Sequence, residues 1–162
     1  MLNSFGHAVP VIAGKLQKTG AAARGIILAT DFTAAADTIT LDIRSAYPAP
    51  DLQKLQRTFV FLRGATPSLT VRDEVKFSAP ETFETALVTW GGIKTISPNV
   101  VEITDGGSTV RVTIDTQGRT FQFRQEQIDE DVQSKRKPIR LGIALDEKIS
   151  EATVTLKIVP VN

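Results

Sequence analysis

The only histidine in the 162-residue sequence, His7, lies in the segment NSFGHAVP close to the start of the chain. Imidazole is a frequent metal ligand and acts as an acid or base near neutral pH. The sequence contains no cysteine, which excludes thiol catalysis, thiolate metal sites and disulfides. Zinc needs three or four ligands, usually including several histidines or cysteines, so His7 cannot form a zinc site alone. Carboxylates would have to complete such a site, and no spacing in the sequence indicates one.

Other catalytic patterns are equally scarce. There is no GxSxG nucleophile motif, no GxxxxGK[ST] phosphate loop and no Rossmann glycine pattern. Paired carboxylates are the remaining enzymatic option, because glycosidases use two of them a few ångströms apart. The candidates are Asp129, Glu130 and Asp131, and the pair Glu81 and Glu84. A run of charges such as 129–131 is, however, typical of a solvated loop or helix face.

Two further features could bind a ligand. Trp90 ends the apolar run LVTW, where an indole either stacks on a sugar ring or belongs to the core or sheet edge. The basic run SKRK at 134–137 either contacts a polyanion or forms a solvated loop. The net charge of +1 gives no general attraction to nucleic acid or to an anionic membrane, so neither is an expected partner.

The elements that would position these residues are strands. Apolar and polar residues alternate with a period of two, which is typical of strands with one buried face. This pattern occurs at 38–43, 110–114, 120–124, 138–146 and 152–159. Turn signals separate the strands, and the clearest hairpin is Asp105-Gly106-Gly107. We predict one all-β domain over residues 1–162, an antiparallel β-sandwich of roughly eleven strands.

Helical signal is limited to two short candidate turns, at 51–55 and 126–134. No apolar run approaches the ~20 residues that span a bilayer, and the start of the chain does not resemble a signal peptide. One strand carries an anomaly, because alternation in LTVRDEVKF places Asp73 on the apolar face. A buried carboxylate is costly unless it is paired. We therefore expect Asp73 to pair with Arg57 or Arg72, or a bulge to turn it outward.

Several segments together resemble heparinase II/III-type polysaccharide lyases. They are SFGHAVPVIAGKLQ at 4–17, TLDIRSAY at 40–47, LQRTFVFL at 55–62 with LTVRD at 69–73, and PETFET at 80–85. In the first segment, His7, Gly14 and Gln17 have the spacing of the family pattern H-x-x-x-x-x-x-G-x-x-Q. The order and spacing of the segments carry the resemblance, rather than any single motif.

The resemblance implies a C-terminal antiparallel β-sandwich that is joined, in the full enzyme, to an α-helical toroid. It also implies β-elimination at a uronic acid, in which a base removes the C5 proton and an acid protonates the leaving oxygen. The family takes its catalytic tyrosine and histidine largely from the helical domain and the domain interface. We therefore assign no catalytic residue to this chain, no role to Tyr47, and expect no lyase activity from the chain by itself.

The resemblance gives His7 one specific role. In some members the corresponding histidine helps to hold a structural metal, beside a histidine and an aspartate just upstream. His7 would then be one ligand of a divalent ion such as zinc, with the other ligands preceding Met1, although Ala8 replaces the usual asparagine. The alternative, which we favour for the isolated chain, is an unliganded histidine near a frayed terminus and no cofactor.

The expected partners follow from the same resemblance: the helical toroid of a parent lyase and an acidic polysaccharide, in a periplasmic or secreted enzyme. Two alternatives remain open. The chain could be a free-standing carbohydrate-binding module that uses Trp90 and the basic residues 135–137. It could instead be a protein-interaction sandwich that forms a homodimer through an uncovered apolar face.

Overall fold

The computed structural model describes residues 3–129 and 135–161. These residues form twelve strands and two short 3₁₀ helices. In chain order the elements are η1 (Ser4–Gly6), β1 (Val11–Ile12), β2 (Ile26–Phe32), β3 (Ala36–Asp42), η2 (Arg44–Ala46), β4 (Leu52–Leu62), β5 (Ser68–Glu81), β6 (Phe83–Thr89), β7 (Gly92–Ser97), β8 (Val100–Asp105), β9 (Ser108–Asp115), β10 (Phe121–Gln127), β11 (Ile139–Leu145) and β12 (Ile149–Val161).

The strands form two antiparallel sheets. The small sheet has the order β1-β6-β11-β10, and the large sheet has the order β2-β3-β4-β5-β12-β9-β8-β7. The predicted all-β sandwich is thus confirmed, with twelve strands in the described residues instead of roughly eleven. The assignment of residues 1–162 to a single domain stays a prediction.

The alternating segments fold as their periodicity predicts. The repeat at 152–159 lies within β12, where Val154 and Leu156 are buried. The hairpin at 105–107 joins β8 to β9, with Asp105 opposite Ser108. Gly106 and Gly107 have φ values of 56° and 84° there, a conformation that favours glycine at both central positions of a tight hairpin turn.

Both candidate helical turns are corrected by the structure. Residues 52–55 begin β4, where Leu52, Lys54 and Leu55 pair with residues 75–77 of β5. At the second candidate, Glu126 and Gln127 end β10, where they pair with Arg140 and Ile139. Residues 130–134 of that candidate lie outside the described residues. Ladder hydrogen bonding thus overrides weak local helix preference in both places.

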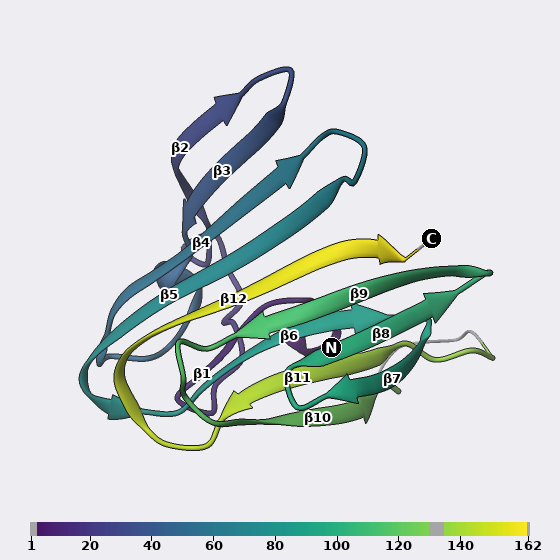
Figure 1. The fold of residues 1–162 in the computed structure, drawn as a ribbon. Helices are drawn as coiled ribbons and strands as arrows, with labels where there is room; N and C mark the ends of the chain where they lie inside the picture. The colour runs from purple at the N-terminus through teal and green to yellow at the C-terminus, as the bar shows by residue number, and fades with distance from the viewer. Residues whose placement is uncertain (1–2, 130–134, 162) are drawn as a thin grey trace.

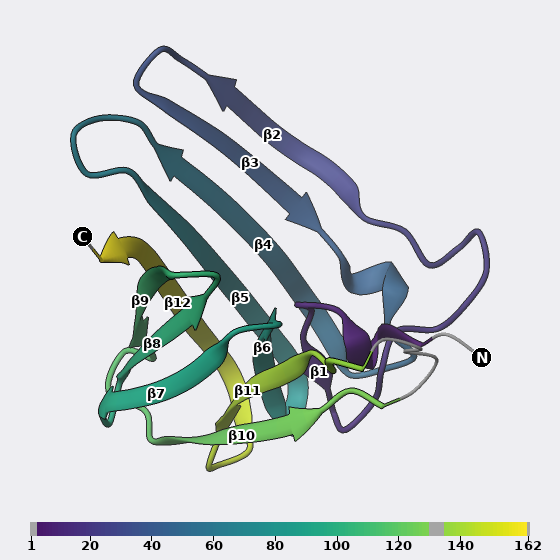
Figure 2. The same cartoon turned by 90° about the vertical axis from the view of Figure 1, so that its right-hand side faces the viewer.

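The core lies between the two sheets. Its buried apolar side chains include Leu55, Val75, Phe77, Val101, Val112, Ile114, Val154 and Leu156 from the large sheet and Ile12, Phe83, Leu141 and Ile143 from the small sheet. Figures 1 and 2 show that the small sheet crosses only one end of the large sheet, so β2, β3 and the far ends of β4 and β5 extend beyond it. The sandwich is therefore two layers deep over only part of its length.

Within residues 3–129 and 135–161, no helix has both the length and the apolar character needed to cross a membrane.

Candidate functional site

His7 lies at the end of η1, in a segment that the rest of the fold holds in place. The side chain of Asn3 accepts a hydrogen bond from the Phe5 amide at 2.8 Å, and the His7 amide donates to the Ser4 carbonyl at 3.2 Å. The His7 side chain itself is exposed. It borders a shallow depression that includes Asn3, Gln17 and Lys18.

A buried ion pair fixes the residue that follows His7. Arg57 donates from Nε and Nη2 to the two carboxylate oxygens of Asp73, at 2.6 and 2.7 Å, and the Thr85 hydroxyl donates to Asp73 Oδ2 at 2.6 Å. Arg57 Nη1 donates to the Ala8 carbonyl at 2.5 Å. The expectation that Asp73 is buried and paired with Arg57 is confirmed, whereas Arg72 pairs with Glu74.

The electrostatics of this pair agree with its geometry. Burial by itself lowers the pKa of the Arg57 guanidinium, but the hydrogen bonds and negative charge of Asp73 outweigh burial and raise that pKa above its ordinary value. Arg57 is therefore a permanent cation inside the sandwich. Its charge is balanced by Asp73 directly opposite on the neighbouring strand.

A second buried arginine, Arg140 of β11, reaches the same segment from the small sheet. Its guanidinium pairs with Glu84, donates from Nη2 to the Val9 carbonyl at 3.3 Å, and lies 5.1 Å from the centre of the Phe5 ring. Arg124 is a looser partner of Glu84, at 3.5 Å. The side chain of Arg140 is 1% exposed, so this contact is shielded from water.

Tyr47 completes a set of three donors. Its hydroxyl donates to the Pro10 carbonyl at 2.8 Å, and its burial raises the pKa of that hydroxyl. The carbonyls of Ala8, Val9 and Pro10 thus accept hydrogen bonds from Arg57, Arg140 and Tyr47 in turn. We call this arrangement the carbonyl clamp. The segment that follows His7 is therefore anchored to both sheets and is not a frayed end.

The chain does not supply a metal site at His7 from its own described residues. No group of three or more histidine, aspartate or glutamate side chains within residues 3–129 and 135–161 is arranged to hold an ion. Besides His7, the depression is lined by two side-chain amides, two hydroxyls and one ammonium group, and by no carboxylate. The role of His7 as a metal ligand stays a prediction, and it would require ligands from outside the described residues.

The carboxylate candidates are separated by the fold. Glu84 is buried and engaged by Arg140, whereas Glu81 pairs with Lys148 at 3.6 Å. Asp129 is exposed and accepts a hydrogen bond from the Gln127 side chain at 3.0 Å, and residues 130 and 131 lie outside the described residues. The structure therefore brings none of these described carboxylates together as an acid–base pair.

The two ligand-binding candidates, Trp90 and the basic run, contact each other near the end of β6. Trp90 is 44% exposed, and its carbonyl accepts a hydrogen bond from Arg136. Arg136 also pairs with Asp105 at 2.5 Å, so its charge is partly balanced. Lys135 is exposed and Lys137 is half-buried, while Ser134 of the basic run lies outside the described residues.

The part of the large sheet that extends beyond the small sheet exposes apolar side chains. Cross-strand partners share a face of a sheet, and Phe59 and Val71 are partners that face the core. Two residues further along the ladder, Phe61 lies on that same face. Two residues of β2 lie on this face as well. Phe32 is opposite Asp37 of β3, which in turn is opposite Phe61. Ile27 is opposite Leu41 of β3, which in turn is opposite Arg57.

We call Ile27, Phe32 and Phe61 the uncovered face. Their exposed fractions are 64%, 62% and 41%, and every residue of β2 is exposed. Arg63 lies 5.6 Å from the Phe61 ring centre and pairs with Asp37, which gives the face a charged rim. A core-type sheet face that is left open to water is characteristic of an interaction surface.

Sequence reasoning singled out Asp73 through a charge in an apolar alternation and named Arg57 as one of two possible partners, but it missed the rest of the carbonyl clamp. Arg140 lies between Ile139 and Leu141, on the side of the strand opposite to the alternating apolar residues. The contact between Arg140 and Val9 joins residues 131 positions apart, so no local pattern carries it.

Comparison with known proteins places the fold. No protein-family model and no curated protein sequence matches the chain. Its structure is similar to that of a heparan sulfate lyase from Pedobacter heparinus, with a TM-score of 0.76, 11% identity and coverage of 98% of this chain and 24% of that chain. It is also similar to a heparinase III gene product, with a TM-score of 0.74, 14% identity and coverage of 96% and 24%.

A further heparinase III structure aligns with a TM-score of 0.69 at 17% identity, again over 96% of this chain and 24% of that one. The chain thus spans about a quarter of the length of each of these proteins. At such low identity the likeness establishes the fold. It confirms the resemblance to the C-terminal β-sandwich of heparinase II/III-type lyases at that level.

Proposed function

We propose that this chain serves as the C-terminal β-sandwich of a heparinase II/III-like polysaccharide lyase and that it packs through the uncovered face onto the helical part of that enzyme. The uncovered face is the observation that carries the proposal. Ile27 and Phe32 of β2 and Phe61 of β4 continue the core face of the large sheet. Figure 2 shows that β2 and the far end of β4 extend beyond the small sheet. Covering them with an apolar partner surface would remove this area from water.

The size comparison supports the choice of partner. The similar lyases are about four times as long as the region that aligns with this chain. The remaining three quarters of such a protein offers an occupant for the uncovered face, with its charged rim at Arg63 and Asp37. In the proposed enzyme, β-elimination of an acidic polysaccharide such as a glycosaminoglycan uses residues outside this chain.

The carbonyl clamp has a defined part in this proposal. It presents His7 at the surface on a segment held by both sheets, which is what a ligand shared with a neighbouring domain requires. Because His7 has no metal-binding neighbours among the described residues, we derive no catalytic or metal-dependent step through it.

Lyase activity tests the division of labour. The purified chain should release no unsaturated uronates from heparan sulfate or alginate, as followed by their ultraviolet absorbance. The polypeptide encoded by the complete native reading frame should release them from one of these substrates. Activity in the isolated chain, or a complete frame without a helical region, would overturn the proposal.

A second candidate function rests on the exposure of Trp90. An indole that is 44% exposed beside Arg136 is available to stack on a sugar, as a free-standing carbohydrate-binding module requires. Under that alternative, Trp90→Ala abolishes polysaccharide binding. Under the proposed domain role, Trp90→Ala leaves polysaccharide binding unchanged, which isothermal titration calorimetry can decide.

A further inference from the structure

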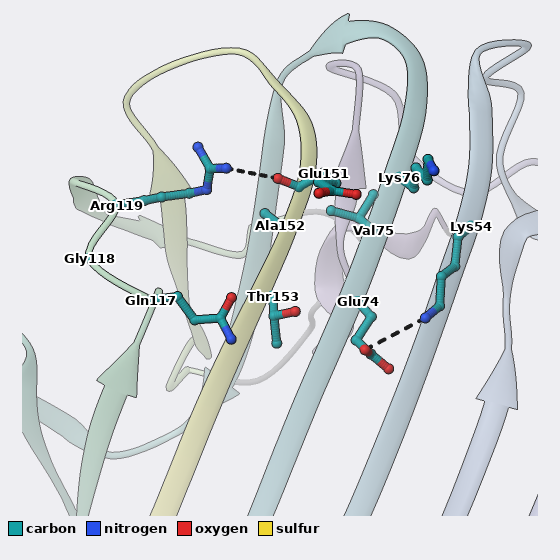
Figure 3. A pocket seen from close by; sticks show the side chains of 10 residues that line it. All are labelled: Lys54, Glu74, Val75, Lys76, Gln117, Gly118, Arg119, Glu151, Ala152 and Thr153. Atoms are coloured by element: carbon teal, nitrogen blue, oxygen red, sulfur yellow. Dashed lines mark hydrogen bonds and ion pairs between the residues drawn. The ribbon is translucent and has the colours of Figure 1, made fainter.

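A pocket of about 460 Å³ lies on the large sheet near its turn after β9. Figure 3 shows Arg119 and Gln117 on one side, Lys54 and Lys76 on the other, and residues of β12 between them. The lining residues are Lys54, Glu74, Val75, Lys76, Gln117, Gly118, Arg119, Glu151, Ala152 and Thr153.

The strand register brings three charged residues into one row across the floor of this pocket. Lys76 of β5 is opposite Lys54 of β4 on one side and opposite Glu151 of β12 on the other. The ladder becomes irregular next to this row on both sides, between Leu52 and Lys54 and between Ile149 and Glu151. Bulges of this kind redirect side chains and are frequent beside functional sites.

The pocket contains positive charge that its own residues do not neutralise. Lys54 is 3.6 Å from Glu74, but Lys76 forms no ion pair among the residues that the structure describes. Arg119 donates at 3.0 Å to a neutral acceptor, the Glu151 carbonyl. Two lysines directly opposite each other on adjacent strands also repel one another. An anionic ligand between Lys76 and Arg119 would relieve this imbalance.

The Arg119 side of the pocket is pre-organised by its turn. The backbone N–H of Gln117 donates to the Asp115 carboxylate at 2.8 Å, and the Thr116 hydroxyl donates to the Arg119 carbonyl at 2.5 Å. Gln117 and Gly118 adopt φ values of 55° and 83°, which bend the chain back over β12. A turn held in this way loses little conformational freedom when a ligand binds.

The remaining lining groups are hydrogen-bonding partners for hydroxyls. The Glu151 carboxylate accepts, and the Thr153 hydroxyl and the Gln117 amide both donate and accept. A ligand that carries only negative charge would be repelled by Glu74 and Glu151. A ligand that combines acidic groups with many hydroxyls satisfies both signs of charge.

We propose that this pocket, which we call the Lys76–Arg119 pocket, binds an acidic oligosaccharide, with Lys76 and Arg119 holding its carboxylate or sulfate groups and Glu151 and Thr153 contacting its hydroxyls. The pocket opens on the face of the large sheet opposite the uncovered face, because Lys54 and Lys76 alternate with the buried residues Leu55 and Val75. Saccharide binding there is therefore compatible with the proposed packing.

Titration of the purified chain with size-matched hexasaccharides tests the proposal. The probes are a heparan sulfate hexasaccharide, an alginate hexamer, neutral cellohexaose and a short single-stranded DNA. We expect binding of at least one of the two acidic hexasaccharides, weakening as salt is added, and no binding of cellohexaose. The variant K76A/R119A should reduce affinity for the bound acidic hexasaccharide at least tenfold, and T153A should reduce it about threefold.

Lys157→Ala is the matched control, because Lys157 is an exposed lysine on the same face of β12 outside the pocket. It should leave the affinity within twofold. Equal losses in Lys157→Ala and K76A/R119A, equally tight binding of DNA, or no binding of either acidic hexasaccharide would each overturn the pocket assignment. The proposed function supplies only the choice of probes here, so a negative result would leave the packing of the uncovered face unaffected.

Discussion

Replacing Asp73 with asparagine tests whether the buried pair with Arg57 stabilises the sandwich as its geometry implies. The two side chains are 1% and 5% exposed, and Asp73 accepts three hydrogen bonds from Arg57 and Thr85. Asparagine keeps the size of the side chain but leaves the Arg57 cation buried without a counter-charge. Breaking a buried pair in this way costs about 3–5 kcal/mol of unfolding free energy. For a chain of this length, that loss lowers the melting temperature by about 6–20 °C.

Glu102→Gln provides the matched control. Glu102 and Arg111 are also directly opposite on neighbouring antiparallel strands, at 2.7 Å, but their side chains are 20% and 47% exposed. An exposed pair of this kind contributes about 0–1 kcal/mol. The two variants therefore differ mainly in burial.

Urea unfolding followed by circular dichroism measures both losses, at low and at high salt. Added salt should reduce the effect of Glu102→Gln and leave that of Asp73→Asn unchanged, because screening acts through the solvent. If Asp73→Asn does not fold, Thr85→Val removes the hydroxyl that donates to Asp73 and accepts from Arg57 Nη2, and it should cost about 1–3 kcal/mol. Equal losses for the buried and exposed pairs, or a salt-sensitive Asp73 effect, would refute the reasoning.

Three further outcomes follow from individual contacts. The Tyr47 hydroxyl ionises near pH ~10 in an unfolded chain, and burial raises its pKa in the folded protein. The stability that the neutral hydroxyl contributes is therefore present below pH ~10 and declines above it. Tyr47→Phe should lose about 1 kcal/mol at pH 8 and show a shallower decline between pH 8 and pH 10.5 in urea unfolding, and identical slopes would contradict this. Gly91→Ala should cost about 1–3 kcal/mol, because a Cβ there would lie 2.6 Å from the Thr104 carbonyl oxygen. Gly92→Ala meets no atom within 4 Å and should change stability by less than about 0.5 kcal/mol, so similar melting temperatures for the two variants would count against the packing.

Much of the architecture was predictable because strand alternation is a local signal. The repeats around Val112, Leu141 and Leu156 predicted buried strands, and the charge of Asp73 in an apolar alternation predicted a partner, for which Arg57 was one of two candidates. Local preference failed at 51–55, where pairing of residues 52–55 with β5 decides the conformation. It failed in the same way at the end of β10.

The functional features were less accessible because they depend on contacts between distant segments. Nothing near Arg140 indicates that the segment after His7 covers it. The apolar run at 26–28 is readable as a strand, but its exposure depends on where the small sheet ends. The Lys76–Arg119 pocket likewise depends on a register between β4, β5 and β12 that no sequence pattern specifies.

The measurement that tests the central claim most directly is the affinity between this chain and the helical region that we propose is encoded with it in its native locus, measured by sedimentation velocity. Phe61 and Leu62 are neighbours on β4 with exposed fractions of 41% and 43%, and they point to opposite faces of the sheet. Phe61→Glu should weaken the complex at least tenfold, whereas Leu62→Glu should leave it intact. Equal effects of the two variants, or a chain that associates only with a second copy of itself, would contradict the account.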